Sequence, residues 1–354
     1  MPIMRTVWRM PHAGSLARLA RATESLPDPG PGEARLRVEA IGLNFADVLA
    51  CLGLYSATPR GAFIPGLECA GTVEAVGPPA ADDAESYRKV AIGDRLCVLT
   101  RFGAYADALN FDLRYSIPVP QGWNAAEAAA WPVQGMTAWY GLIDRARVAQ
   151  GECVLLQSAA GGVGLQALGM LAGAGARVIA TVGSEAKRAF LASRYGVDPR
   201  TVIVRNRRRF GRQLDGALTA TGSDGFDIVF DAVLGPYFRP AFARLRPQGR
   251  FVLFGAAEFM PAGRRPNYAS LLWRWLRRPR LDPLAMISAN QCLIGFNLIW
   301  LWEEAGRLPA AVAGLRQFTT RPPYVGARLP FANAPQAMRL LQAGGTTGKV
   351  VLTL

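Results

Sequence analysis

The feature that most constrains the fold is a glycine-rich turn, AAGGVG at residues 159–164, which follows an apolar run and opens a helix-like stretch. The apolar run is CVLLQS (153–158), and a second one, RVIATV (177–182), begins within about 20 residues, the spacing of a strand–helix–strand unit. Glycine allows a sharp turn and close approach to a pyrophosphate, whose charge is stabilised by free N–H groups and the helix dipole. The turn therefore predicts a dinucleotide-binding loop made of Ala160, Gly161, Gly162, Val163 and Gly164.

Short β-branched runs alternate with helix-like stretches through the middle of the chain, a pattern typical of a parallel sheet with helices on both faces. The runs that predict strands are residues 153–158, 177–182, 201–205, 226–232, 250–255 and 292–297. Six strands is the number found in a doubly wound dinucleotide-binding sheet. We therefore expect an α/β fold with a six-stranded, doubly wound parallel sheet.

The two ends of the chain have a different pattern. EARLRVEAIG, GLECAGTVEAVG and GDRLCVL are strand-like pieces separated by Gly and Pro, with little helical periodicity. The closing run, GKVVLTL, has no partner in a complete six-stranded sheet and is expected to return to the N-terminal unit. The sequence thus predicts a β-rich domain at 1–130, a dinucleotide-binding domain at 131–301 and a return to the β-rich domain at 302–354.

The end of the second strand carries no acidic residue. An NAD-preferring site usually presents Asp or Glu there to the adenosine ribose, whereas this chain has VGS at 182–184. Lys187 and Arg188 follow one helical turn later, and Arg205 closes the third strand, so cations occupy the region expected for a 2′-phosphate. Together with Ser184 they predict NADP(H) as the cofactor. The alternative is that they are ordinary surface charges in an arginine-rich protein.

Several motifs occur in one order along nearly the whole chain: AIGLNFADVLACLGLY (40–55), PGLECAGTVEAVG (65–77), GDRL (93–96), the Gln134–Thr137 turn and AAGGVG. With these motifs the chain resembles the quinone oxidoreductase branch of the medium-chain dehydrogenase/reductase family, which includes the VAT-1-like proteins of synaptic vesicles. The resemblance implies a Rossmann domain inserted into a GroES-like catalytic domain, with the active site in the cleft between them. It also implies a homodimer.

Zinc ligands of the family are missing. Zinc-dependent members carry a Cys in the segment that matches AIGLNFAD and a His-Glu pair where this chain has Gly66, Leu67 and Glu68. The single histidine, His12, lies in an N-terminal turn and is expected at the surface, and the five cysteines form no CxxC pair. Because catalytic zinc usually takes three protein ligands that include His or Cys, we expect no metal.

The resemblance also implies which residues line the cleft: Asn44, Asp47 and Tyr55 in the N-terminal unit, and Thr137 near the nicotinamide. We expect Asn44 to orient the nicotinamide or the acceptor, and Tyr55 to donate a hydrogen bond or a proton to the reduced atom. The alternatives are a loop aromatic that only caps the cleft, for Tyr55, and a turn residue, for Asn44.

Further cofactor contacts are expected at the carboxyl ends of the last two strands, where open α/β sheets bind ligands. These are Phe254 and Gly255 on the fifth strand, and Phe296 and Asn297 on the sixth. Lys349, within GGTTGKVVL, matches a region of the family that approaches the cofactor phosphates. A surface lysine explains this position equally well.

A basic and aromatic insert, GRRPNYASLLWRWLRRPRLDPLAMI, separates the fifth and sixth strands. If residues 271–278 are helical, one face presents apolar side chains and the other arginines: Leu271, Leu272, Trp275 and Leu276 against Arg274, Arg277 and Arg278. Such a helix would bind an anionic membrane weakly. A lid or a dimer contact is the equal alternative.

The overall interpretation is an NADPH-dependent reductase of a small quinone or enone, because acceptors that are already electrophilic suit hydride transfer without zinc. The net charge of +14 attracts anions, but no nucleic-acid-binding motif accompanies it, so we expect no nucleic-acid role. No apolar run approaches the roughly 20 residues of a membrane span and no signal peptide is recognisable, so we expect a cytoplasmic or membrane-peripheral protein. An enoyl-thioester reductase and a VAT-1-like peripheral membrane or adaptor protein with residual nucleotide binding remain alternatives.

Overall fold

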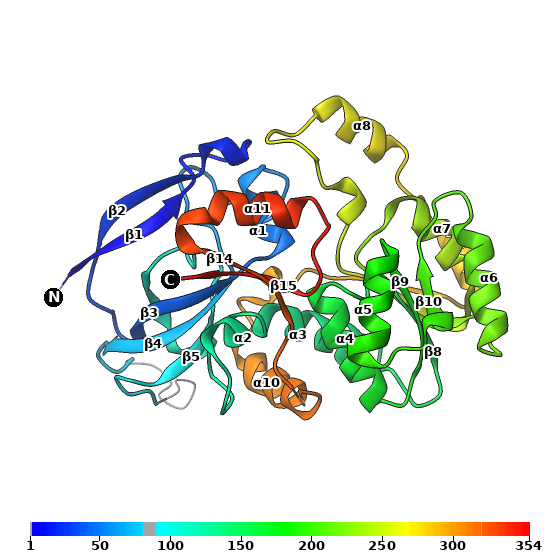
Figure 1. Ribbon diagram of the computed structural model, residues 1–354, viewed down its shortest axis with the longest axis horizontal. Helices are drawn as coiled ribbons and strands as arrows, with labels where there is room; N and C mark the ends of the chain where they lie inside the picture. The colour runs from blue at the N-terminus through cyan, green and yellow to red at the C-terminus, as the bar shows by residue number, and fades with distance from the viewer. Residues whose placement is uncertain (1, 81–88, 320) are drawn as a thin grey trace.

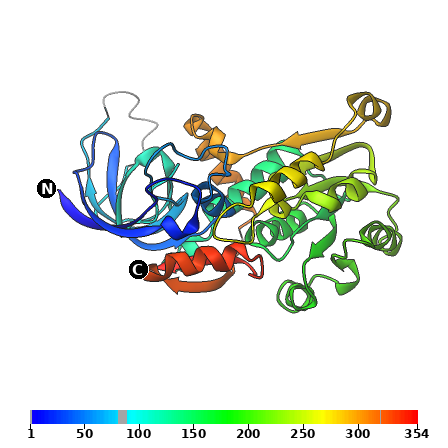
Figure 2. The same cartoon turned by 90° about the horizontal axis from the view of Figure 1, so that it is seen from above.

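Two β-sheets lie side by side in the computed structural model, which describes residues 2–80, 89–319 and 321–354 (Figure 1). One sheet has six strands, all from the middle of the chain, and the other has seven. The seven-stranded sheet takes strands from both ends of the chain, as the blue and red segments on the left of Figures 1 and 2 show. The architecture is therefore the predicted one, a Rossmann sheet inserted into a β-rich domain.

The six-stranded sheet is parallel throughout, with the order β10-β9-β8-β11-β12-β13. Its strands are β8 (Cys153–Leu156), β9 (Arg177–Val182), β10 (Val202–Val204), β11 (Phe226–Asp231), β12 (Leu245–Leu253) and β13 (Cys292–Gly295). The order confirms the doubly wound prediction. The main difference is β12, which begins five residues before the predicted start because Leu245 pairs with Phe226; the register then shifts before Ile228 pairs with Arg250, and the extra residues lie in β12.

Helices cover both faces of this sheet. One face is covered by α3 (Pro132–Trp139), α4 (Gly162–Gly173) and α5 (Glu185–Tyr195), and the other by α6 (Phe210–Ala220) and α7 (Phe238–Phe242). Val154 and Leu156 of β8 pack into the core on the first face, whereas Cys153 and Leu155 pack into the core on the second. This alternation is the period of two that a strand imposes on its side chains.

The seven-stranded sheet has the order β14-β15-β3-β4-β5-β7, with β6 paired to β3 as well. Its strands are β3 (Glu33–Gly42), β4 (Glu68–Val76), β5 (Arg95–Leu99), β6 (Ala108–Asp112), β7 (Ser116–Pro118), β14 (Val325–Pro330) and β15 (Lys349–Thr353). The helices α1 (Phe45–Cys51), α2 (Ala125–Ala129) and α11 (Ala334–Gln342) lie beside it, and β1 (Ile3–Arg9) and β2 (Ala20–Leu26) form a separate antiparallel pair. The closing strand β15 pairs antiparallel with β3, so both ends of the chain build this sheet.

The two sheets share one core where they meet. Fully buried Trp131 belongs to a cluster that also holds Ala40 of β3 and Phe230 of β11. The backbones are joined as well, because the N–H of Gly348 donates to the carbonyl of Ala160 at 2.8 Å. Apolar burial and backbone bonding therefore fix the two units against each other.

The division of the chain into domains at residues 130 and 301 stays a proposal. Residues 1, 81–88 and 320, which fall within the predicted domains, lie outside the described residues. One helix packs with a different domain from the one to which the proposed division assigns it. α10 (Leu308–Gln317) belongs by sequence to the range 302–354, but its Leu315 packs in the shared core beside Gly135 of α3.

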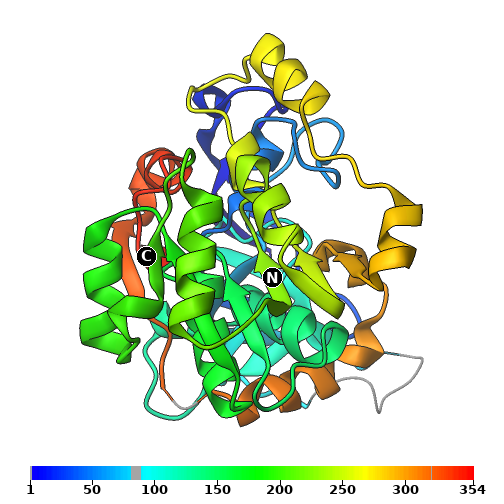
Figure 3. The same ribbon diagram turned by 90° about the vertical axis from the view of Figure 1, so that its right-hand side faces the viewer.

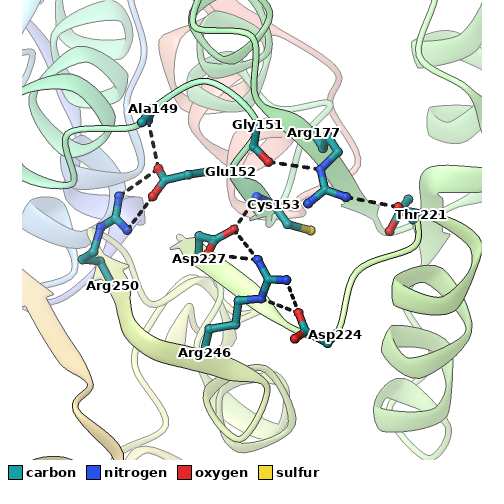
Figure 4. Close-up of polar contacts among 10 residues, drawn as sticks. All are labelled: Ala149, Gly151, Glu152, Cys153, Arg177, Thr221, Asp224, Asp227, Arg246 and Arg250. Carbon is teal, nitrogen blue, oxygen red and sulfur yellow. Dashed lines mark hydrogen bonds and ion pairs between the residues drawn. The ribbon is translucent and has the colours of Figure 1, made fainter.

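Ion pairs hold the amino end of the six-stranded sheet (Figure 4). Arg250 pairs with Glu152 at 2.8 Å, and Arg246 pairs with Asp227 at 3.2 Å. The carboxylate of Asp227 also accepts the N–H of Cys153, the first residue of β8, at 2.7 Å. These polar groups bind one another, whereas the glycine-rich loop lies at the opposite, carboxyl end of the strands.

The insert between β12 and β13 forms two short helices, α8 (Tyr268–Leu276) and α9 (Pro283–Ala289), and α8 stands out from the sheet (Figure 3). The predicted helix at 271–278 is wrong in its bounds, because α8 begins at Tyr268 and ends at Leu276. Arg277 and Arg278 therefore follow the helix instead of sharing a helical face with Arg274. Across residues 2–80, 89–319 and 321–354, no helix has both the length and the apolar character needed to span a bilayer.

Gly164 is expected to tolerate no side chain, because a Cβ there would lie 2.5 Å from the oxygen of Ser158 and 2.6 Å from the Cα of Ala159. Gly164→Ala should lower the free energy of unfolding by about 1–3 kcal/mol in urea denaturation. Gly169→Ala on the same helix is the matched control, since its Cβ meets only the oxygen of Phe318 at 3.8 Å. Helix propensity predicts that this control gains up to about 1 kcal/mol. Equal effects of the two substitutions would contradict the packing described here.

Candidate functional site

The glycine-rich loop follows β8 directly, and Gly161 is the residue that precedes the first turn of α4. Its N–H donates to the carbonyl of Ser158 at 2.9 Å, and Ser158 itself has a positive φ of 56°, so the loop turns tightly. A Cβ on Gly161 would meet only the oxygen of Ser158, at 3.3 Å, whereas a Cβ on Gly162 would lie 1.8 Å from Oε1 of Gln134. The side chain of Gln134 therefore fills the space beside Gly162, whereas the space beside Gly161 is open to a ligand. The N-terminus of α4 favours a phosphate in that space.

Gln134 is a loop contact that the sequence motifs suggest only as part of the Gln134–Thr137 turn. Thr137 lies one turn further along α3, and its hydroxyl donates to the carbonyl of Val133 at 2.6 Å. Ala160 and Val163, the apolar members of the loop, pack into the shared core. Contact of Thr137 with a nicotinamide stays a prediction.

A buried ion pair lies next to this loop. Nζ of Lys349 is 2.5 Å from Oε1 of Glu68 and 2.8 Å from Oδ1 of Asn44. Lys349 is 1% exposed and Glu68 is completely buried. The surface-lysine alternative is therefore wrong. Gly348 forms a β-bridge with Gly161, so the backbone of Lys349 lies next to the glycine-rich loop. The ammonium group of Lys349 binds inside the β-rich domain.

Glu68 connects four parts of the fold through this cluster. It is the first residue of β4, and its Oε1 binds Lys349 of β15 and Nδ2 of Asn44, the latter at 2.9 Å. Its other carboxylate oxygen accepts the N–H of Val133 at 2.8 Å, at the start of α3. A carboxylate at a helix N-terminus is favoured by the helix dipole. Glu68 therefore ties β4, β15, α1 and α3 together at one point.

The side-chain amide of Asn44 has no free donor. Its Nδ2 donates to Glu68 and, at 3.3 Å, to the carbonyl of Gly42, while its Oδ1 accepts from Lys349. A carbonyl oxygen has a second lone pair, so Asn44 could still accept a hydrogen bond from a ligand. The expected role of Asn44 in orienting a nicotinamide is thus limited to an acceptor role.

Asp47 is fully buried and lies next to the cluster formed by Lys349, Glu68 and Asn44. Its Oδ2 accepts the N–H of Asn44 at 2.8 Å and the hydroxyl of Tyr105 at 3.3 Å, and its Oδ1 has no hydrogen-bond partner among the described residues. Burial raises the pKa of Asp47 to about 7. These contacts fit a residue that positions Asn44 and the start of α1, and direct participation of Asp47 in catalysis stays a prediction.

Tyr55 and Asn297 meet across the two domains. The hydroxyl of Tyr55, in the loop after α1, donates to Oδ1 of Asn297 at 2.8 Å, just beyond the end of β13. Burial raises the pKa of Tyr55 to about 12, and the hydrogen bond to Asn297 opposes this shift. The phenol therefore stays protonated at neutral pH and keeps a proton to donate.

Aromatic rings gather at the carboxyl ends of β11, β12 and β13. Phe254 stacks on Phe230 with ring centroids 4.2 Å apart, and Phe296 lies 6.0 Å from Phe254. Tyr140 packs edge-on against Phe296 at 5.0 Å. Next to Phe254, a Cβ on Gly255 would lie 3.0 Å from a backbone oxygen, so the chain packs closely there. The rings make this end of the sheet apolar.

Two cations converge at the end of β9. Nη1 of Arg205 donates to Oγ1 of Thr181 at 2.9 Å, and its Nη2 lies 3.8 Å from the Cβ position of Gly183. Lys187 donates to the carbonyl of Gly344 at 2.9 Å. Burial, and after it the charge of Arg205, lower the pKa of Lys187, so the two cations are close enough to interact. Neither forms an ion pair with a described carboxylate.

Arg188 lies apart from these two cations. It pairs with Glu185 at 2.7 Å and lines a hollow of about 270 Å³ with Arg200 beside β10. Ser184 caps α5, and its hydroxyl accepts the N–H of Lys187 at 3.4 Å. The structure thus brings Lys187 and Arg205 together at the end of β9 and leaves Arg188 in a separate hollow lined by β10 and α6.

No group of three or more His, Cys, Asp or Glu side chains that could hold a metal ion occurs in the part of the chain that the structure describes. His12 is exposed, as expected. Independence of zinc rests on the missing ligands and stays a prediction.

Two known families match the chain. Residues 30–153 match the alcohol dehydrogenase GroES-like domain, and residues 162–273 match the zinc-binding dehydrogenase family. The human synaptic vesicle membrane protein VAT-1 homolog is 30% identical over 332 residues, which cover 92% of this chain and 80% of that protein. The mouse VAT-1 homolog-like protein is 28% identical over 348 residues, covering 96% and 79%.

Solved structures match the chain over almost its full length. A mycobacterial protein solved in complex with NADPH is 30% identical, with a TM-score of 0.81, and covers 99% of this chain and 100% of its own. The quinone oxidoreductase from Thermus thermophilus, also solved with NADPH, is 29% identical with a TM-score of 0.73 and the same coverage. CurK enoyl reductase is 26% identical, with a TM-score of 0.77 and 99% coverage of both chains.

The buried ion pair gives a prediction about stability. Lys349→Met leaves Glu68 as an unpaired buried charge, which should lower the free energy of unfolding by about 3–5 kcal/mol. Adding Glu68→Gln removes that charge, so the double variant should be at least about 2 kcal/mol more stable than Lys349→Met alone. Urea denaturation of the two single variants and the double variant measures this coupling. Additive losses would mean that the two groups do not stabilise each other.

Proposed function

The chain belongs to the medium-chain dehydrogenase/reductase family, in its quinone oxidoreductase type, and we propose that this oxidoreductase uses NADPH to reduce a quinone or an α,β-unsaturated carbonyl without a metal ion. The hydrogen bond between Tyr55 and Asn297 is the observation that carries the proposal. It joins a phenol of the GroES-like unit to the carboxyl end of the Rossmann sheet, where open α/β sheets bind ligands.

NADP(H) fits the residues at the ends of β8 and β9. The open side of the loop at Gly161 suits the pyrophosphate, and Lys187 and Arg205 suit a 2′-phosphate because neither forms an ion pair with a described carboxylate. The NADPH complexes of the mycobacterial and Thermus thermophilus proteins support the same choice.

Reduction of such an acceptor consumes one hydride and one proton. The bound nicotinamide supplies the hydride. Tyr55 holds a proton at its hydroxyl oxygen, and its pKa is raised to about 12. Its single O–H, which Asn297 accepts in this structure, would turn from Asn297 to the acceptor and donate a hydrogen bond to the developing negative charge. Phe254 and Phe296 provide an apolar wall that excludes water from the reacting atoms. Asn44 offers an acceptor lone pair whose direction is fixed by Lys349.

An enoyl-thioester reductase is the second candidate, and the likeness to CurK enoyl reductase favours it. The chemistry is the same, since an enoyl thioester is itself an α,β-unsaturated carbonyl. A VAT-1-like adaptor role with residual nucleotide binding is the third, supported by the VAT-1 homologues. Homodimer formation and weak membrane contact through residues 271–278 remain proposals with no contact in the single chain to support them.

The cofactor proposal predicts an unequal effect on the two nicotinamide dinucleotides. Lys187→Ala or Arg205→Ala should lower the ratio of kcat/KM for NADPH to that for NADH by at least about tenfold, since a hydrogen bond to a charged group contributes about 1.5–3 kcal/mol. Arg188→Ala is the matched control and should leave the ratio unchanged, because Arg188 pairs with Glu185 and lines a separate hollow beside β10. A wild-type enzyme that prefers NADH would overturn the choice of NADPH.

The acceptor proposal is tested by NADPH oxidation with a panel of quinones, enones and enoyl thioesters. We expect turnover with at least one class, and we expect Tyr55→Phe to lower kcat by about 10²-fold if the hydroxyl donates its proton in the transition state. The KM for NADPH should change far less than kcat in this variant, since Tyr55 makes no contact with the glycine-rich loop, Lys187 or Arg205. An unchanged kcat would remove the proton-donor role. If NADPH is oxidised with none of these compounds, the adaptor role would be favoured.

A further inference from the structure

A cleft of about 710 Å³ lies between α8 and the carboxyl ends of β11 and β12. We call it the arginine cleft, because arginine is its most frequent lining residue: Arg207, Arg239, Arg274, Arg277, Arg278 and Arg280. Glu258 is the single carboxylate among its described lining residues. The volume is in the range of roughly 300–1,000 Å³ that small-molecule sites occupy.

The positive charge of the arginine cleft is largely uncompensated. Only Arg207 has a carboxylate partner among the described residues, Glu258 at 3.2 Å. Arg274 donates to the backbone carbonyl of Glu258, which compensates no charge, and Arg239 and Arg280 have no side-chain hydrogen bond or ion pair in the described chain. Like charges gathered in a concave site repel one another and focus a positive potential on it. An anion bound there would relieve that repulsion.

Two of the guanidinium groups are held in place by tryptophans. Arg277 stacks on Trp273 with its Cζ 3.9 Å from the ring centroid, and Arg278 stacks on Trp275 at 3.8 Å. Arg278 also donates to the carbonyl of Trp275 at 2.9 Å. A planar guanidinium that is already oriented loses little entropy when it binds the oxygens of a phosphate. Arg277 covers one face of the Trp273 ring, so a flat base that enters the cleft would stack on the opposite face.

The arginine cleft is distinct from the proposed dinucleotide site. Its lining residues include neither the glycine-rich loop nor Lys187 nor Arg205. Gly235 follows β11 and Glu258 follows β12, whereas the loop follows β8 and Lys187 follows β9. The same end of the sheet therefore carries a second cationic region, which adjoins the residues suited to a 2′-phosphate, because Arg207 of the cleft stands two residues after Arg205.

A single ligand can extend from this cleft to the aromatic wall of the active site. Phe254 of that wall and Glu258 of the cleft are four residues apart, so their Cα atoms are separated by at most about 14 Å. A molecule with phosphates at one end and a long flexible arm at the other can cover this separation. A quinone, which carries no phosphate, would leave the arginines unused.

We propose that the arginine cleft binds the phosphate groups of coenzyme A, so that the acceptor is an enoyl-CoA thioester. The inference rests on the proposed function, because it names the class of α,β-unsaturated carbonyl that the same site reduces. The phosphates of the coenzyme bind the arginines, and its adenine stacks on Trp273. The thioester arm then extends past Glu258 towards Phe254.

The kinetic test compares two thioesters that share the same enoyl group, crotonyl-CoA and crotonyl-N-acetylcysteamine, of which only the first carries phosphates. We expect kcat/KM to be at least about 10²-fold higher for crotonyl-CoA. In the double variant Arg239→Ala with Arg280→Ala this advantage should fall at least about tenfold, whereas Arg328→Ala with Arg339→Ala should retain it. The control variant removes the same charge from exposed positions on β14 and α11, away from the cleft. An advantage that is absent, or equal in both variants, would overturn the inference.

A binding measurement separates this inference from the proposed function. Titration calorimetry with coenzyme A at saturating NADPH should show binding that weakens at least about tenfold in the Arg239/Arg280 variant. Competition between coenzyme A and NADPH, or the absence of coenzyme A binding while simple enones are reduced, would overturn the inference and leave the proposed function standing. Coenzyme A binding without NADPH oxidation on any acceptor would retain the cleft assignment and overturn the function. Cleft-dependent binding to phosphatidylserine vesicles, without binding of coenzyme A, would overturn the inference by assigning the arginines to lipid headgroups instead.

Discussion

The buried ion pair between Lys349 and Glu68 is the interaction on which the geometry of the site depends. Burying two charges carries a large desolvation cost, which is offset only when both charges keep their partners. Glu68 meets this condition with Lys349, Asn44 and the N–H of Val133, so a shift of any one of these groups would leave a charge exposed to an apolar core. The pair therefore fixes the positions of β4, β15, α1 and α3 relative to one another. The side chains of the candidate site that these elements carry are fixed with them.

The Rossmann half of the fold could be predicted from local sequence, because each of its determinants is a short pattern. A strand buried on both faces appears as a continuous apolar run, and Gly162 and Gly164 stand where a Cβ would collide with Gln134 or with the backbone of Ser158 and Ala159. The first residues of β12 and the end of α8 were not predictable in this way. The pairing of Leu245 with Phe226 is a contact between distant residues and is followed by a register shift within β12, and Arg277, just after the last residue of α8, stacks on Trp273.

The sequence alone predicted the glycine-rich loop of the candidate site, but it predicted the contacts of the other site residues only in part. The contacts that give Tyr55 and Lys349 their roles join residues 242 and 305 positions apart, and no local pattern encodes such a distance. The resemblance to a family pointed to Asn44 and Tyr55, but it could not tell that the amide donors of Asn44 are already occupied. Lys187 and Arg188 are adjacent in the sequence, yet they point to different surfaces, because neighbours on a helix diverge by about 100°.

The pairing of β15 with β3 has a consequence for how the protein is made. β3 and Glu68 leave the ribosome long before β15 and Lys349 are synthesised, so during most of translation the carboxylate of Glu68 lacks its ammonium partner. Contacts between such distant segments close late, because the chain entropy of a long loop has to be lost first. The six-stranded sheet is complete in the sequence before β15 appears and can fold in the meantime. The candidate site is therefore complete only after β15 has been synthesised, later than the six-stranded sheet.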